Sequence, residues 1–328
     1  MQTTPLSKTA SSQWAQVSEL GFGCAAIGGR TSRKDSLIAL GLAHDAGVTL
    51  YDTARSYGYG ESEAIVGEFL RGRRESVVLC TKFGILPARQ GGWKQKLKPA
   101  ARAAVRLFPG LRGAVRSQVT DQFLGGQFSV EILTTSFETS LRELQTDYVD
   151  MLLMHAAPES VLQQDDMLEA LERLVTSGKV RLAGISAEQP VIASYFDQRP
   201  KALQTAQFAV NLANIAFTAE TLRNGDLLLV GNHPFGGPTG AAGGKSAIAT
   251  LAASAVLPAS LREKLDANDP QVMPELVLNC ILRGTGMTAV IPAMMQPRHI
   301  ESNIRAVTAC RFTAEELELL RKCLSTPE

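Results

Sequence analysis

The stretch VTLYDTARSYGYGESEAIVGEFL, residues 48–70, contains the pattern that decides the fold. Residues 48–52 form a short run of β-favouring residues, which predicts a strand that ends at Asp52. A polar loop with several glycines then carries Tyr57. Residues 61–71 show helical spacing and are followed by Gly72, a residue suited to a left-handed helix end. One strand, one loop with ionisable side chains and one helix therefore follow each other directly.

The same alternation of strand and helix continues along the chain. After ELGFGCA near the N-terminus, the predicted strands cover residues 48–52, 77–82, 149–155, 180–186, 203–208, 227–232 and 288–292. The predicted helices cover residues 34–45, 61–71, 129–145, 165–177, 273–282, 297–309 and 314–323. Such alternation predicts a parallel sheet, and about eight strands are the number that closes a barrel. We expect an α/β fold, a (β/α)8 TIM barrel that occupies residues 1–328 as a single domain.

Residues 85–128 interrupt this alternation directly after the third predicted barrel strand. The segment is far longer than the roughly 2 to 6 residues typical of βα loops, and it combines Gly and Pro with many Lys and Arg. An insertion at this place in a barrel lies over the active-site face, which predicts a lid or a loop that sets substrate specificity. A solvated basic helical excursion explains the same composition, and the sequence leaves both interpretations open.

Composition and charge exclude several classes of protein. The formal net charge is +1, without the basic excess that nucleic-acid binding uses, so we expect no nucleic-acid partner. The 5 cysteines are scattered and do not form the close pairs of metal sites or disulfide scaffolds, which favours a reducing cytosol. The longest uncharged apolar stretch, residues 246–261, is shorter than the roughly 20 residues that cross a bilayer, and the N-terminal residues lack the apolar core of a signal peptide. We expect a soluble cytoplasmic protein with no membrane partner, a monomer or weak homo-oligomer.

Polar side chains stand at the carboxyl ends of five predicted strands: Asp52, Lys82, His155, Ser186 and Gln207. In a parallel barrel these ends converge on one mouth, so residues distant in the sequence meet there. A single His after an apolar strand is commonly a structural hydrogen-bonding residue. The recurrence at five strand ends indicates a functional site instead.

Tyr57 adds a phenol to this set. Tyrosine usually titrates at about pH 10, so proton transfer at neutral pH requires a nearby cation that stabilises the phenolate, and Lys82 can be that cation. Asp52 would hold Lys82 through an ion pair, and His155 would hydrogen-bond the carbonyl oxygen of a substrate. This combination suits the protonation of a developing alkoxide.

Further motifs extend the pattern along the chain: GFGCAAIGG, DTARSYGYGESEAIVGEFL, VVLCTKFG, SLRELQTDYVDMLLMH, SGKVRLAGIS and an Ile-Pro pair followed later by Asn303. In this order and spacing the chain resembles the aldo-keto reductases over essentially its whole length. The resemblance implies a (β/α)8 barrel that moves a hydride between nicotinamide C4 and a carbonyl carbon without a metal. It implies Asp52, Tyr57, Lys82 and His155 as the catalytic tetrad, with Tyr57 as general acid/base, and a small carbonyl, sugar or alcohol as substrate.

The resemblance also implies NADP(H) or NAD(H) as cofactor. Asp52 would approach the nicotinamide ribose, while Ser186 and Gln207 would hydrogen-bond the carboxamide. The aromatic residue that stacks on the nicotinamide in the family is replaced here by Asn232, with His233 and Phe235 as candidate substitutes. The nicotinamide end of the predicted cofactor site thus matches the family in part.

The adenosine end of the predicted cofactor site differs more. Many relatives hold an adenosine 2′-phosphate with a Lys and a Ser, where this chain has Ala293 and Met294. Asn303 matches the residue that meets adenine in the family, and Arg298 lies at the start of the next predicted helix, so we assign both, with Pro292, to cofactor binding. Without the Lys and Ser, weak discrimination between NADP(H) and NAD(H) is expected.

A second hypothesis comes from the departures from the family pattern. Ala187 replaces the Asn that usually follows the Ser of the carboxamide site, and Asn232, Ala293 and Met294 differ as described. These changes suit a catalytically silent barrel that binds a nucleotide or a protein partner. The presence of all four tetrad side chains favours the enzyme.

Overall fold

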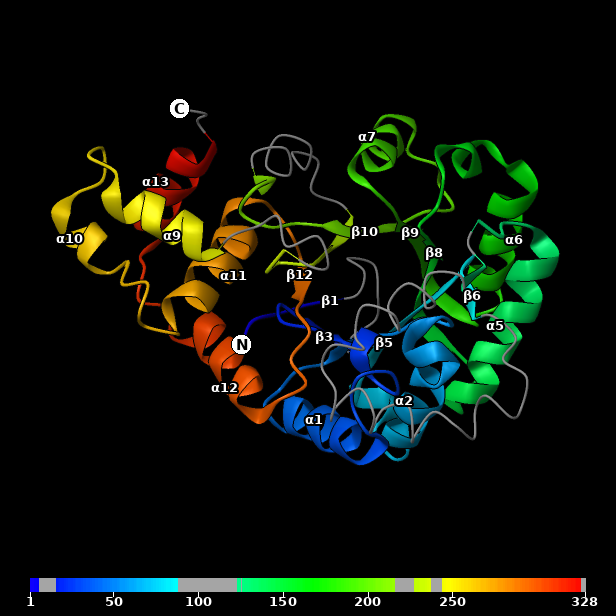
Figure 1. Cartoon of the computed structure of the whole chain (residues 1–328). Helices are drawn as coiled ribbons and strands as arrows, with labels where there is room; N and C mark the ends of the chain where they lie inside the picture. The colour runs from blue at the N-terminus through cyan, green and yellow to red at the C-terminus, as the bar shows by residue number, and fades with distance from the viewer. Residues whose placement is uncertain (6–15, 88–122, 125, 216–226, 237–243, 326–328) are drawn as a thin grey trace, which may run out of the picture.

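The chain forms a barrel of parallel strands with helices on its outside (Figure 1). The computed structural model describes all residues except 6–15, 88–122, 125, 216–226, 237–243 and 326–328. The barrel strands are β3 (Phe22–Gly23), β4 (Leu50–Asp52), β5 (Val78–Phe83), β8 (Val149–His155), β9 (Val180–Ser186), β10 (Thr205–Ala209), β11 (Leu228–Asn232) and β12 (Ala289–Ile291). They form an 8-stranded sheet in chain order, and every neighbouring pair is parallel.

The segment before β3 joins the two edges of this sheet. Leu20 pairs with Val290 of β12 in a parallel bridge. The Gly21 amide donates to the Val290 carbonyl at 2.8 Å, and the Val290 amide donates to the Glu19 carbonyl at 2.8 Å. The predicted (β/α)8 barrel is confirmed, and each predicted strand overlaps an observed one.

The helices surround the barrel (Figure 1). They are α1 (Arg33–Asp45), α2 (Ser62–Leu70), α5 (Val130–Leu144), α6 (Asp165–Thr176), α7 (Gln189–Gln198), α9 (Gly244–Ala253), α10 (Ala259–Glu263), α11 (Val272–Gly284), α12 (Pro297–Thr308) and α13 (Ala314–Ser325). Short 3-10 helices cover Cys24–Ala26, Tyr57–Gly60, Arg74–Ser76 and Glu159–Gln163. In the part of the chain that the structure describes, no helix has the length and hydropathy needed to span a bilayer.

Three of these helices were not expected from the sequence. Residues 189–198 contain Pro190, which suggests a turn, yet a proline in the first helical turn costs no internal hydrogen bond. α9 begins at Gly244 after a glycine-rich stretch, and α10 is a single short helix that begins after Pro258. The start of α5 follows from its capping residue, because Ser129 Oγ accepts the Ile132 amide at 3.2 Å.

Alternation along the strands decides which side chains face the barrel interior. The apolar interior consists of Val17, Leu50, Val78, Cys80, Met151, Leu153, Leu182, Leu228, Val230, Ala289 and Ile291. Successive side chains of a strand point to opposite faces, so the residues two positions beyond Leu50, Cys80, Leu153 and Val230 also face inward. These residues are Asp52, Lys82, His155 and Asn232. The apolar core therefore ends in a polar layer at the carboxyl ends of the strands.

A two-stranded hairpin, which the sequence did not predict, covers the opposite end of the barrel. β1 (Thr3–Pro5) pairs with β2 (Gln16–Ser18) in an antiparallel ribbon. The Ser18 amide donates to Thr49 Oγ1 at 2.9 Å, and the Thr49 amide donates to Ser18 Oγ at 2.9 Å. Val17 of β2 is fully buried among the inward-facing apolar residues, so the hairpin helps to fill the amino-terminal end of the barrel.

The insertion after the third barrel strand begins and ends beside the Tyr57 loop. β6 (Leu86–Pro87) pairs with β7 (Phe123–Leu124) in an antiparallel ribbon. A Cβ on Gly60 would come within 3.3 Å of Pro87, which places β6 against the loop that carries Tyr57. Residues 88–122 and 125 lie outside the described residues, so the choice between a lid and a solvated basic excursion stays a prediction.

A buried carboxylate near the amino ends of the strands joins three of them. Asp150 Oδ2 accepts the Leu79 amide and Arg74 Nη2, each at 2.8 Å, and Oδ1 accepts Arg181 Nη1 at 2.6 Å. Both guanidinium groups lie over the Tyr148 ring, 3.8 and 4.5 Å from its centroid. Asp150 is fully buried, so each of its bonds replaces a contact with water.

We expect Asp150→Ala to lower the free energy of unfolding by about 3 to 5 kcal/mol, the scale for removing one partner of a buried ion pair. The substitution removes the carboxylate that pairs with both guanidinium groups and accepts the Leu79 amide. Urea denaturation followed by circular dichroism measures the change. Asp147→Ala, at an exposed carboxylate three residues earlier, is the matched control. A loss no larger than that of the control would contradict this account of Asp150.

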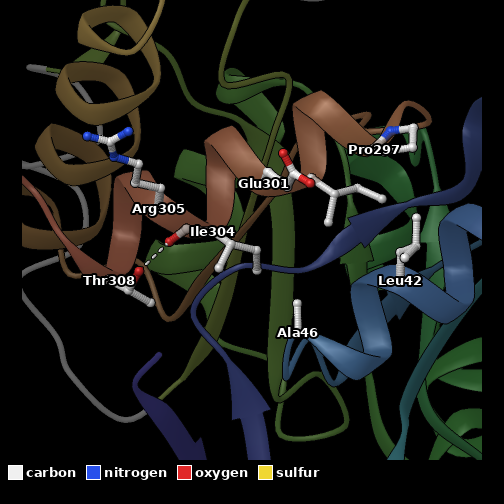
Figure 2. Close-up of a pocket in the computed structure, with 8 residues that line it drawn as sticks. Leu42, Ala46, Pro297, Glu301, Ile304, Arg305 and Thr308 are labelled. Atoms are coloured by element: carbon white, nitrogen blue, oxygen red, sulfur yellow. Dashed lines mark hydrogen bonds between the residues drawn. The ribbon is translucent and has the colours of Figure 1, made fainter.

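The outer wall of the barrel carries a groove between α1 and α12 (Figure 2). It has a volume of about 400 Å³ and is lined by Leu42, Ala46, Pro297, Ile300, Glu301, Ile304, Arg305 and Thr308. Leu42 is 41% exposed, and Ile38 one turn earlier is 48% exposed. The lining includes none of the inward-facing residues at the strand ends, so this groove is separate from the polar layer.

Candidate active site

The inward-facing residues at the carboxyl ends of the strands form one connected cluster. The structure brings together Asp52 of β4, Lys82 of β5, His155 of β8, Ser186 of β9, Gln207 of β10 and Asn232 of β11. Hydrogen bonds join Lys82 and Gln207 to Asp52, and join Ser186 and Asn232 to Gln207. Neighbouring strands in register supply neighbouring side chains, as for Ser186 and Gln207, which are direct partners across β9 and β10.

Lys82 lies at the centre of the cluster, with a side chain that is 0% exposed. Its Nζ donates to Asp52 Oδ1 at 2.6 Å, to the Thr53 carbonyl at 3.0 Å and to the Tyr57 hydroxyl at 3.2 Å. Burial alone lowers the pKa of Lys82, but attraction to Asp52 outweighs it, and the pKa lies above its usual value. Lys82 is therefore a cation at neutral pH, held by Asp52 and directed at Tyr57.

The Tyr57 hydroxyl is placed by a tight turn. Gly58 has φ of 60°, and a Cβ at this position would lie 2.0 Å from the Ile27 carbonyl oxygen, so only glycine fits. Burial raises the pKa of Tyr57 to about 12, although Lys82 acts to lower it. The sequence predicted that Lys82 favours the phenolate. Lys82 does lower the pKa of Tyr57, but burial raises this pKa by more. Tyr57 is therefore a neutral phenol with a proton to donate.

His155 faces Tyr57 across the cluster. The two rings are 5.7 Å apart and meet edge to face at 85°. Burial and the Lys82 charge lower the pKa of His155 to about 3, which keeps the imidazole neutral. Its Nδ1 atom is buried and has no hydrogen-bond partner among the described residues. The ring is thus not used as a structural hydrogen-bonding residue through Nδ1.

A chain of hydrogen bonds extends from Asp52 to the far side of the barrel mouth. Gln207 Nε2 donates to Asp52 Oδ1 at 2.8 Å. The Gln207 Oε1 atom accepts Ser186 Oγ at 3.1 Å and Asn232 Nδ2 at 3.4 Å. The side-chain oxygen of Asn232 is buried without a partner in the described part of the chain. Both Ser186 and Gln207 are buried, so this row is fixed before any ligand binds.

Three residues assigned to the adenosine end, and His233 of the nicotinamide end, complete the predicted cofactor site. Arg298 is exposed in the first turn of α12, and Pro292 is buried just after β12. Asn303 is buried, and its Nδ2 lies 3.8 Å from the Met294 sulfur. His233, next to Asn232, is exposed with φ of 52°. None of these four residues takes part in the hydrogen bonds that join the strand-end cluster, although His233 feels the charges of Asp52 and Lys82.

The sequence did not single out a second group of residues that supports the cluster. Glu63 of α2 is buried, and its carboxylate accepts Arg55 Nη1 at 2.8 Å and Thr81 Oγ1 at 2.6 Å. Arg55 lies two residues before Tyr57, and Thr81 lies next to Lys82, so Glu63 ties both segments together. One feature of the sequence could have indicated this role: Glu63 stands in the first turn of a helix, and apolar residues follow it directly.

Among the described residues, no group of three or more His, Cys, Asp or Glu side chains is arranged to hold a metal ion. The arrangement is that of a proton donor beside a buried cation, with a neutral imidazole opposite it. Such an arrangement protonates an oxygen atom that gains negative charge.

Comparison with known proteins agrees with this geometry. Residues 19–214 match the profile of the Aldo/keto reductase family, which is more than half of the chain. The chain belongs to the aldo/keto reductase family. Its relative YhdN, an aldo-keto reductase of Bacillus subtilis (strain 168), is 32% identical over 177 residues, 52% of this chain and 44% of YhdN. The match thus spans less than half the length of that curated relative.

Two solved aldo-keto reductases share the fold along nearly the whole chain. The holo form of AKR11C1 from Bacillus halodurans gives a TM-score of 0.68 at 23% identity and covers 99% of this chain and 97% of that one. The enzyme from Klebsiella pneumoniae in complex with NADPH gives a TM-score of 0.63 at 24% identity, with 96% and 93% covered. These likenesses show that the barrel is the one that aldo-keto reductases use.

Proposed function

We propose that this aldo-keto reductase interconverts an aldehyde or ketone and the corresponding alcohol, with NADP(H) or NAD(H) as cofactor and Tyr57 as general acid/base. One observation carries the proposal. The Tyr57 hydroxyl lies 3.2 Å from Lys82 Nζ, which in turn lies 2.6 Å from Asp52 at the inward-facing mouth of the barrel. A small carbonyl, sugar or alcohol fits this chemistry as substrate.

Each residue of the tetrad has a separate task. Tyr57 is neutral and donates its proton to the substrate oxygen as negative charge develops there. Lys82 stabilises the phenolate that remains, because its ammonium group already contacts the hydroxyl. Asp52 keeps Lys82 charged and in place. His155, neutral at this position, donates a hydrogen bond from Nε2 to the substrate oxygen and orients it.

The residues at the barrel mouth fit a nicotinamide cofactor. Their buried hydroxyl and amide groups suit the carboxamide, and the Asn232 oxygen without a partner calls for a hydrogen-bond donor. Asp52, Ser186, Gln207, Asn232 and His233 would hold the nicotinamide end. Pro292, Arg298 and Asn303 would hold the adenosine end. The bound cofactor supplies the hydride, and the residues above orient it.

The function is tested by mixing the purified protein with NADPH or NADH and a panel of small aldehydes and ketones. The proposal expects loss of the reduced-cofactor absorbance that depends on the carbonyl compound. Binding of either cofactor without turnover across the panel would support the alternative of a catalytically silent barrel.

We expect only weak preference for NADPH over NADH, because Ala293 and Met294 offer no charge or hydroxyl for a 2′-phosphate. One charge-assisted hydrogen bond contributes about 1.5 to 3 kcal/mol, so its absence reduces discrimination by about ten- to a hundredfold. Arg298 is exposed at the start of α12, and any preference that remains should depend on it.

Titration of both reduced cofactors into wild type and Arg298→Ala measures this preference. The substitution should make the two dissociation constants equal, while Arg305→Ala on the same helix leaves their ratio unchanged. A strong NADPH preference that survives in Arg298→Ala would show that the adenosine site lies elsewhere.

A further inference from the structure

Glu63 connects the loop that carries Tyr57 to the strand that carries Lys82. Its side chain is 1% exposed, and each carboxylate oxygen has a donor of its own. Oε2 accepts Arg55 Nη1 at 2.8 Å, and Oε1 accepts Thr81 Oγ1 at 2.6 Å. Arg55 lies two residues before Tyr57, and Thr81 lies directly before Lys82. One buried side chain of α2 therefore contacts both segments.

These contacts close a ring that includes the proposed proton donor. The backbone joins Arg55 to Tyr57, and it joins Thr81 to Lys82. Glu63 bridges the two segments through Arg55 and Thr81. The hydrogen bond of 3.2 Å from Lys82 Nζ to the Tyr57 hydroxyl completes the ring. The separation of the phenol from the ammonium group thus depends on the contacts that Glu63 makes.

The Tyr57 loop needs such support because its backbone is strained. Tyr59 has φ of 59°, in the left-handed region that residues with a side chain seldom adopt. A conformation of this kind costs free energy and persists where surrounding contacts hold it. The Arg55 Nε atom is buried without a partner among the described residues, so the ion pair with Glu63 is what anchors this side chain.

Ser62, the residue before Glu63, attaches α2 to the barrel separately. Its hydroxyl donates to the Cys24 carbonyl at 3.2 Å and lies 2.9 Å from Thr53 Oγ1. These contacts use neither oxygen of the Glu63 carboxylate. A substitution at Glu63 therefore loosens the link between the Tyr57 loop and β5, while this attachment of α2 remains.

We propose that Glu63 is a positioning residue: by tying Arg55 to Thr81, it holds the Tyr57 hydroxyl in hydrogen-bond contact with Lys82. The effect on turnover rests on the proposed function. The hydrogen bond itself exists in the protein without substrate or cofactor, so it can be measured separately. A group displaced by about 1 Å from its reactive position loses about 10²-fold in rate, which sets the scale of the expected effect.

The first measurement follows the Tyr57 hydroxyl directly by NMR. The chain has 5 tyrosines, and carbon-13 at the ring carbon that bears the hydroxyl gives one signal for each, which responds to hydrogen bonds and charges at that hydroxyl. Tyr57→Phe identifies the Tyr57 signal, and Lys82→Met shows where it lies without the Lys82 contact. Glu63→Ala should move the signal most of the way toward that position. Glu68→Ala should leave it in place, because Glu68 lies on the same helix and pairs with Arg33 of α1.

The second measurement is steady-state kinetics on a carbonyl compound that wild type reduces. Glu63→Ala should lower kcat by about a hundredfold and keep KM within about twofold, because Glu63 acts through Tyr57. Thr81→Val removes one hydrogen bond of the ring at nearly constant side-chain size, and it should lower kcat by about tenfold and move the NMR signal in the same direction. Thr81→Ser keeps the hydroxyl and should restore most of this loss. The Thr81 variants keep the inference testable if Glu63→Ala fails to fold.

The outcomes separate the inference from the proposed function. A Tyr57 signal that stays in place in folded Glu63→Ala or Thr81→Val overturns the positioning role and leaves the oxidoreductase proposal intact. Equal displacement of the signal in Glu68→Ala, or equal losses of kcat in Thr81→Ser and Thr81→Val, also overturns it. A signal that moves as expected in a protein that reduces no carbonyl compound supports the positioning role and overturns the proposed function alone.

Discussion

In Tyr57→Phe, turnover of any carbonyl compound that wild type reduces should fall by about 10² to 10⁴, the usual contribution of a general acid. The phenylalanine keeps the ring that meets His155 edge to face and removes only the hydroxyl that contacts Lys82. The hydroxyl matters as the substrate oxygen gains charge, so the affinity for cofactor should remain nearly unchanged. Steady-state kinetics and cofactor titration measure the two quantities.

Tyr59→Phe provides the matched control, since it removes a hydroxyl from the same loop at a residue outside the proposed tetrad. Its turnover should stay near that of wild type. Wild-type turnover in Tyr57→Phe would remove Tyr57 from the mechanism.

Lys82→Met should lower turnover near neutral pH by about 10² to 10³, the scale for losing one preorganised charge beside a developing oxyanion. Lys82 contacts the Tyr57 hydroxyl and stabilises its phenolate, so without it Tyr57 is a weaker acid. Cofactor affinity should fall less than turnover. Circular dichroism is needed as a check of folding, because Asp52 is left buried without its cation.

The pH profile of Lys82→Met distinguishes a chemical role from a structural one. The pKa of Tyr57 is about 12 with Lys82 present, and removal of the positive charge moves it higher. Alcohol oxidation requires the phenolate, so its rate rises with pH, and this rise should move to higher pH in the variant. The alkaline loss of carbonyl reduction should move in the same direction. An unchanged profile would contradict the coupling of Tyr57 to Lys82.

The sequence was sufficient for the barrel because its strands are short apolar runs with polar residues at one end. Leu50 and Asp52 illustrate the reason: both face inward, one in the apolar interior and one in the polar layer. In a parallel barrel the ends of all strands meet, so strand-end position alone groups Lys82, His155 and Gln207. No tertiary information beyond the fold class was needed to bring these side chains together.

The supporting contacts could not be predicted in the same way. Glu63 reaches Arg55 and Thr81 from a different element, and nothing in the spacing of these residues shows that their side chains meet. The hydrogen bond between Asn232 and Gln207 could not be predicted either, because the two residues are 25 positions apart in the sequence and lie on different strands. The hairpin of β1 and β2 was missed because two short segments of three residues carry too little pattern.

The central claim is that the cluster around Tyr57 directs hydride transfer from a nicotinamide cofactor to a carbonyl carbon. Reduced cofactor carrying deuterium at one face of C4 tests it most directly, with mass spectrometry of the alcohol product as the measurement. The account predicts deuterium on the carbinol carbon from one face of the cofactor and not from the other, and loss of this labelled product in Tyr57→Phe. An alcohol formed without deuterium from either face, or formed equally well in Tyr57→Phe, would contradict it.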